Sequence, residues 1–105
     1  VLIEGFQAMV EVQTGPFATR TRARYALFLE LTGDPELAEP LLRQRREFER
    51  WTEQIVTAVG IADPAPATRA LMAFGDGLML HRLTIDPELD MRPVIERAIR
   101  ALAES

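Results

Sequence analysis

Residues 70–80 read ALMAFGDGLML, and ten of these eleven residues are apolar or glycine. The chain around them is charged: Asp, Glu, Lys and Arg make up 27% of the residues, and the formal net charge is −4. A helix with so little polar surface must bury more than one side. The stretch therefore predicts a helix between two partners, and in a chain of 105 residues the second partner is expected to be another subunit.

Proline and glycine divide the chain into five segments, and none of the segments shows a sustained period-2 alternation of apolar and polar residues. The breaks fall at Gly15-Pro16, Gly33-Asp34-Pro35, Gly60 to Pro66 and Asp86-Pro87. We therefore expect an all-α fold, a five-helix orthogonal or bundle domain that takes up residues 1–105 as a single domain. The expected helices cover about 2–13, 17–31, 35–59, 64–83 and 90–104.

The longest helix is expected to begin at Asp34 and Pro35, because Asp is a good N-cap and proline suits the first helical position. Apolar residues then recur by steps of four and three, which is typical of a coiled-coil-like seam with one polar interruption. The seam comprises Leu37, Leu41, Gln44, Phe48, Trp51, Ile55 and Ala58. The opposite side carries RQRRE and other charges at helical spacing, which indicates a solvated face rather than a nucleic-acid patch.

The helix over 64–83 has two apolar faces. One contains Ala70, Leu71, Phe74, Gly77, Leu78 and His81, and the other contains Met72, Gly75, Met79 and Leu83. Each face carries a glycine, which costs about 1 kcal/mol relative to alanine within a helix, so we expect a neighbouring backbone to approach closely at each. Asp76 is expected to pair with Arg69 or with an arginine of a partner subunit. His81 is expected to be packed or interfacial rather than a metal ligand.

The composition excludes several kinds of chemistry. The sequence has no Cys and no Lys, its one Ser is Ser105 and its one His is His81. It therefore offers no disulfide, thiolate metal site, Schiff base or Ser-His-Asp arrangement, and we expect neither a metal nor another cofactor. A pI near 5.0 argues against direct binding to DNA phosphates by this segment. The absence of Cys favours a reducing, cytoplasmic location, and since no run of about 18 apolar residues is present we expect no membrane-spanning segment and no membrane partner.

Arg24 lies between the aromatic positions of the second helix. One interpretation is an arginine whose aliphatic stem covers apolar surface while its charge reaches water or a carboxylate. The other interpretation is an anion-binding residue in a pocket.

Four stretches, taken in order, resemble the C-terminal half of TetR-family transcriptional regulators. They are ARYALFLELTGDPELAEPL at 23–41, the long Arg/Glu helix that ends in AVG at 58–60, DPAPATRALMAFGDGLML at 63–80 and PVIERAIRAL at 93–102. The resemblance covers most of the chain, but the family's N-terminal helix-turn-helix module is absent from it. DNA binding is therefore expected to belong to that missing part.

The resemblance implies a regulatory domain that binds a small hydrophobic or amphipathic effector and forms a homodimer. Two late helices would pack in an intermolecular four-helix bundle, and we assign them to 35–59 and 64–83. The effector would shift the population of two subunit arrangements. Candidate effector-binding residues are Phe6, Met9, Val10, Arg24, Tyr25, Phe28 and Trp51. Candidate interface residues are Leu41, Phe48, Ile55, Leu71, Phe74, Gly77, Leu78 and His81, with the Phe74 face turned to the second subunit and the methionine face to the pocket.

Two other functions fit a small helical chain. One is an all-helical enzyme of mutase type, in which arginines would bind a dianionic substrate. The absence of Lys and the placement of most arginines on solvated faces argue against it. The other is a purely structural helical module that dimerises without binding a ligand.

Overall fold

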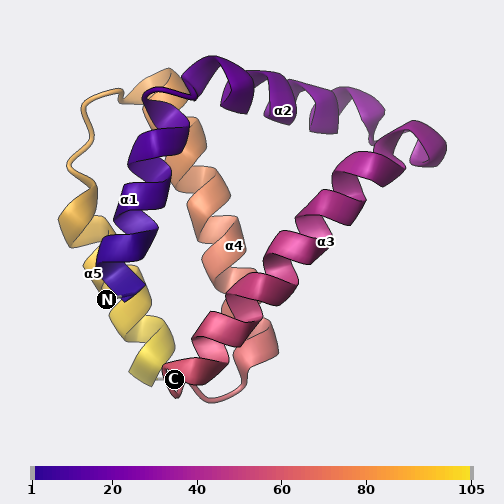
Figure 1. Cartoon of the computed structure of the whole chain (residues 1–105). Helices are drawn as coiled ribbons and strands as arrows, with labels where there is room; N and C mark the ends of the chain where they lie inside the picture. Colours follow the sequence, from indigo (N-terminus) through magenta and orange to yellow (C-terminus); the bar gives the residue numbers. More distant parts are fainter. Residues whose placement is uncertain (1, 105) are drawn as a thin grey trace.

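The computed structural model describes residues 2–104, and these residues form five α-helices and one short π-helical turn (Figure 1). The elements are α1 (Leu2–Thr14), α2 (Ala18–Leu31), α3 (Pro35–Ala58), α4 (Pro64–Leu80), η1 (His81–Ile85) and α5 (Met91–Glu104). The predicted all-α fold is confirmed. The helix expected over 64–83 differs in one respect, because its last turn from His81 onward is π-helical.

Local chemistry explains where the long helix begins and ends. The Asp34 carboxylate accepts a hydrogen bond from the Leu37 backbone N–H at 3.3 Å, so the predicted N-cap is confirmed. Gly60 follows the helix with φ of +86°, a left-handed conformation that glycine adopts without steric cost. Pro64 opens α4, whereas the Asp63 side chain makes no capping bond.

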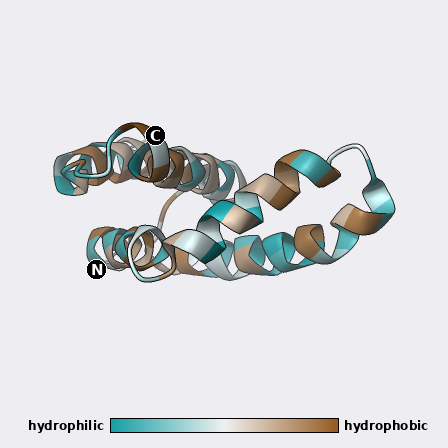
Figure 2. Ribbon diagram, turned by 90° about the horizontal axis from the view of Figure 1, so that it is seen from above, coloured by the Kyte–Doolittle hydropathy of each residue, from teal (hydrophilic) through white to brown (hydrophobic). Residues whose placement is uncertain are grey.

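The core lies where α1, α4 and α5 pack together with the end of α3. Val10, Val56 and Ile95 are almost completely buried there. α2 packs mainly against α1 and α3, and its only buried residue is Thr21. In Figure 1, α2 and the beginning of α3 accordingly extend away from the other helices. Figure 2 shows hydrophobic and hydrophilic residues alternating along the helices, as amphipathic helices require.

The buried stripe of α3 is not the predicted seam. Ala38, Thr52 and Val56 are its buried residues, whereas Trp51 of the seam is 56% exposed. The buried stripe is thus turned by one residue from the seam. Both stripes follow the same spacing of three and four, so the spacing alone does not distinguish them; the stripe that meets α4 is decided by tertiary packing.

The methionine face of α4 is buried within this one chain, whereas the first face is buried only in part, because Ala70, Gly77 and His81 are exposed. Leu71 and Leu78 are buried residues of the first face, and Gly75 and Met79 are buried residues of the second. A Cβ atom added to Gly75 would lie 3.3 Å from Cζ of Phe6, so the expected close approach occurs there, although against a side chain rather than a backbone. A Cβ atom on Gly77 would meet no atom within 4 Å.

Candidate functional site

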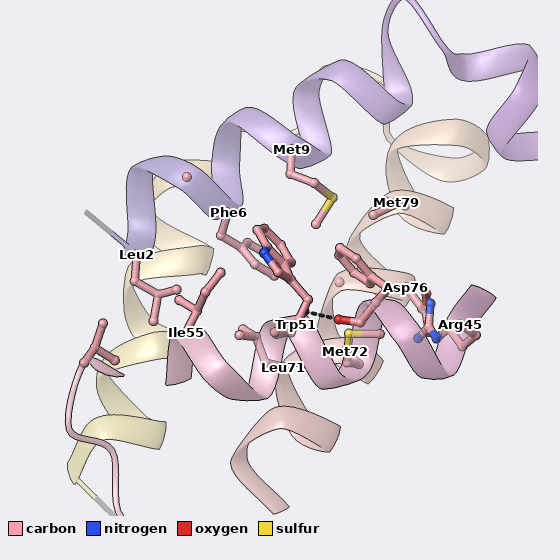
Figure 3. A pocket seen from close by; sticks show the side chains of 15 residues that line it. Leu2, Phe6, Met9, Arg45, Trp51, Ile55, Leu71, Met72, Asp76 and Met79 are labelled. Atoms are coloured by element: carbon pink, nitrogen blue, oxygen red, sulfur yellow. Dashed lines mark hydrogen bonds and ion pairs between the residues drawn. The ribbon is translucent and has the colours of Figure 1, made fainter. Parts of the chain in front are cut away.

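An apolar pocket of about 310 Å³ lies between α1, α3 and α4 (Figure 3). Each helix contributes residues at helical spacing, so each presents one stripe to the same space. The lining residues are Leu2, Gly5, Phe6, Met9, Arg45, Phe48, Trp51, Thr52, Ile55, Val59, Leu71, Met72, Gly75, Asp76 and Met79. This space is called the first pocket below.

One end of the first pocket is polar. Arg45 of α3 donates two hydrogen bonds to the Asp76 carboxylate of α4, one of them from Nη1 to Oδ1 at 3.0 Å. The Tyr25 hydroxyl donates to Oδ1 of Asp76 at 2.6 Å. Figure 3 shows Arg45 and Asp76 together at one end, with Leu2 and Ile55 at the other. Asp76 therefore ties α2, α3 and α4 together where the pocket ends.

The partner of Asp76 corrects a prediction. Arg69, which we expected to pair with Asp76, instead lies 3.8 Å from a carboxylate oxygen of Glu49. Its side chain is 83% exposed, so this contact contributes little to stability. The Arg45 and Asp76 side chains are only 31% and 29% exposed, and their pair is screened less by water.

The environment of Tyr25 keeps its phenol neutral. Burial raises the pKa of the phenol well above its ordinary value of 10.0, and the hydrogen bond and negative charge of Asp76 raise the pKa further. Tyr25 consequently acts as a hydrogen-bond donor, because its proton is committed to Asp76.

A second pocket of about 230 Å³ lies beside the first, between α1, α2, α3 and α4. It is lined by Met9, Gln13, Arg24, Tyr25, Phe28, Leu41, Gln44, Arg45, Phe48 and Met79. Four of these residues, Met9, Arg45, Phe48 and Met79, also line the first pocket. The two spaces therefore meet along these four side chains, with an apolar chamber on one side and a more polar one on the other.

The structure distributes the predicted effector-binding residues over both pockets. Phe6 and Trp51 line the first, Met9 lines both, and three others, Arg24, Tyr25 and Phe28, line the second. Val10 lines neither pocket, because its side chain is wholly buried in the core.

The predicted interface residues separate into three groups. Leu41, Phe48, Ile55 and Leu71 line the pockets. Leu78 is buried in the core and Phe74 stacks on Phe6 with ring centroids 5.7 Å apart. Gly77 and His81 are exposed, and Nδ1 of His81 lies 3.2 Å from the Gly77 carbonyl oxygen. Only this last pair lies on open surface of α4.

Sequence reasoning missed Arg45, because its spacing from Glu49 placed it on the solvated face of the long helix. A signal was present, however: Asp76 is the only charged residue in the 70–80 stretch. A carboxylate in such a setting requires a cation or several donors, and these can come from any neighbouring helix. Thr52 and Gly5 also line the first pocket and were not predicted, whereas Met72, Gly75 and Met79 belong to the methionine face that we expected to turn toward the pocket.

Within residues 2–104 no group of His, Cys, Asp and Glu side chains is placed to hold a metal ion. No helix in the same range combines the length and the apolar character needed to cross a membrane.

Comparison with known proteins identifies one family model over almost the whole sequence. The model is described as tetracyclin repressor-like, C-terminal domain, and it matches residues 2–105. No curated protein and no solved structure matches the chain significantly.

Proposed function

Because the chain belongs to the family of tetracyclin repressor-like C-terminal domains, we propose that it is the effector-binding and dimerisation domain of a cytoplasmic transcriptional regulator. In this proposal DNA is bound by a separate N-terminal domain outside this sequence. The chain senses a small molecule and transmits its presence through the subunit interface. We assign it no catalytic role.

The observation that carries the effector-binding proposal is the first pocket itself. A concave apolar space with a few polar groups at one end is the usual form of a small-molecule site. Trp51 and Phe48 stack with ring centroids 5.7 Å apart and remain 56% and 37% exposed. An apolar effector would cover these rings and gain about 25 cal/mol for each Å² removed from water.

The first pocket can couple effector binding to the arrangement of the two subunits. It touches α1, α3 and α4, and α4 also carries the exposed surface available to a second subunit. An effector that binds one position of α4 better than another shifts the population toward that position. The coupling is reciprocal, so dimer formation changes effector affinity by the same factor.

The dimer surface in this proposal is the exposed side of α4. Three of its residues, Ala70, Ala73 and Gly77, are small, which allows a second helix to approach closely, and Leu80 with the adjacent His81 of η1 extends the surface. A usual interface buries about 800 Å² per partner, more than one helix side supplies. We therefore propose that α5, with Val94 38% exposed, supplies the second helix in place of α3, whose seam lines the pockets.

A variant that fills the first pocket tests effector binding. Gly5 lines the pocket, and a Cβ atom there meets nothing within 4 Å, so Gly5→Leu fills the space and also removes a helical glycine. A library of apolar and amphipathic compounds is screened by thermal shift. We expect compounds that stabilise the native chain to lose their effect on Gly5→Leu.

Ala8→Leu is the control, because Ala8 is exposed on the same helix and lines neither pocket. A library without a single stabilising compound would refute the effector proposal.

A charged side chain on the outer side of α4 tests the interface. We expect Ala73→Arg to give a folded monomer in sedimentation, since an unpaired charge at a tightly packed interface is costly. Ala26→Arg on exposed α2 is the matched control and should leave the dimer intact. Phe74→Arg is less suitable, because Phe74 stacks on Phe6 inside the chain. A native chain that is monomeric at micromolar concentration contradicts the proposal.

A further inference from the structure

We propose that the effector is an amphipathic carboxylate, with its apolar body in the first pocket and its carboxylate beside Arg24 in the second. This inference rests on the proposed function and specifies the chemical class of the ligand. It follows from the different polarity of the two spaces and from their common boundary.

The common boundary of the two pockets favours one ligand that occupies both. Met9, Phe48 and Met79 line the first and the second pocket alike. Two of the three are methionines, whose flexible side chains adapt to a ligand that passes between them. A molecule longer than the first pocket can therefore reach the second by displacing methionine side chains, without breaking a helix.

The charges that line the second pocket favour an anion. Its charged residues are Arg24 and Arg45, and no Asp or Glu lines it. The charge of Arg45 is matched by Asp76 through two hydrogen bonds. Among the described residues Arg24 has no hydrogen-bond or ion-pair partner in the structure, and its guanidinium carbon lies 5.6 Å from the centroid of the Tyr25 ring. One unmatched positive charge thus faces the space.

The remaining polar groups of the second pocket can supply donors. The Gln13 side-chain oxygen lies 3.0 Å from the Thr21 hydroxyl, and the NH₂ group of the same amide is a donor. Gln44 can turn its own NH₂ group to the same space. A planar carboxylate suits a guanidinium flanked by amide donors, and one net positive charge favours a monoanion over a dianion.

The first pocket favours an uncharged body. Its charged lining residues, Arg45 and Asp76, bond to each other, so neither is free to compensate a ligand charge. Apart from the Thr52 hydroxyl, which donates to the Phe48 carbonyl at 2.8 Å, and the indole N–H of Trp51, its other side chains are apolar. A ligand charge placed there would remain unpaired and would lower affinity.

The test uses probes with one tail and different heads: decanoate, decanol, decylamine and decyl phosphate, each below its micellar concentration at neutral pH. Trp51 is the only tryptophan and lines the first pocket, so its fluorescence reports occupation by the tail. We expect decanoate to bind about tenfold tighter than decanol, because its carboxylate forms a charge-assisted hydrogen bond with the partly buried Arg24. Added salt should reduce this preference.

Arg24→Gln is expected to remove the preference for decanoate while leaving decanol affinity unchanged. Arg20→Gln is the control, because Arg20 lies one helical turn away and lines neither pocket. Equal affinity for decanoate and decanol, tighter binding of decylamine or decyl phosphate, or an equal preference in Arg24→Gln overturns this inference and leaves effector binding standing. Absence of binding by every probe, together with a thermal-shift screen without a hit, overturns the proposed function as well.

Discussion

At the scale of the residue, Asp76 has hydrogen-bond partners on two other helices. Its carboxylate accepts from the Tyr25 hydroxyl of α2 and from two nitrogens of Arg45 of α3. A charge placed in an apolar helix is stable only with such partners, because a carboxylate buried without donors pays a large desolvation cost. The first pocket is therefore polar at one end because the Asp76 carboxylate requires hydrogen-bond donors there.

The titration of Tyr25 is the first prediction at this scale. Tyr25 is the only tyrosine, so the phenolate absorbance of the whole chain reports this residue alone. We expect it to remain protonated at pH 10, where a free phenol is half ionised. Because its pKa is raised in the folded state, the stabilisation it contributes is complete below the unfolded pKa of 10.0 and is lost as the pH rises above that value.

Two comparisons control the titration. The chain unfolded in guanidinium should titrate near pH 10. Asp76→Asn should move the pKa of Tyr25 part of the way back, since burial is its largest cause and persists without the charge of Asp76. A folded native chain whose phenolate appears with a midpoint at the ordinary value contradicts the geometry at Asp76.

At the scale of the element, α4 has two glycines with opposite surroundings. Gly75 faces the ring of Phe6, which is itself only 9% exposed and stacks on Phe74. Gly77 lies two residues later and faces open space in the isolated chain. One helix thus uses one glycine for packing within the chain and leaves the other on the surface that we assign to the dimer.

The same substitution at the two glycines should have opposite effects. Gly75→Val is expected to lower the free energy of unfolding by about 1–3 kcal/mol, because the added atoms press on a well-packed ring. Gly77→Val is expected to leave it unchanged or raise it by roughly a few tenths of a kcal/mol, through helix propensity alone. Urea unfolding in the monomeric Ala73→Arg background measures both without a contribution from dimerisation. Equal effects would mean that Phe6 does not approach α4 as described.

At the scale of the whole molecule, the chain is more open than a compact domain of its length. Its radius of gyration is 14.3 Å, against about 13 Å for 100 residues in a compact domain. The cause is the arm formed by α2 and the beginning of α3, where Leu29 is 78% exposed and Leu37 60%. The core is correspondingly concentrated at the other side, where the first and last helices pack together.

Acid should weaken an ion pair within α5, beside its contact with α1. Arg92 of α5 donates to Glu96 at 2.6 Å and to Glu4 of α1 at 2.9 Å. The hydrogen bond from Arg92 lowers the pKa of Glu96 below its ordinary value of 4.5. Glu96 therefore stabilises the fold above that pH, and its contribution is lost as the pH falls below it.

Thermal unfolding as a function of pH measures this contribution. Glu96→Gln and Arg92→Gln should both show a shallower loss of stability below pH 4.5 than the native chain, since each removes the same bond from one side. The Arg92 and Glu96 side chains are 42% and 28% exposed, so water partly screens their pair and we expect a small effect. Variants that follow the native pH profile throughout would show that this bond does not contribute to acid stability.

The sequence by itself determined the helices and the family. Asp34, Pro35 and Gly60 act on the backbone within a few residues, so the ends of α3 could be predicted without knowing what it packs against. Four stretches in order sufficed to predict the family, and the match over residues 2–105 confirms it.

Tertiary structure alone decided which sides of the helices meet. Two stripes of α3 satisfy the same apolar spacing, and contact with α4 selects the one through Thr52 and Val56. The Asp76 carboxylate bonds to Arg45, which is 31 residues away in the sequence. It does not bond to Arg69, which is seven residues away on its own helix. Helical periodicity is a local property that the sequence displays directly, whereas the partner of a charge or of an apolar stripe depends on distances in space.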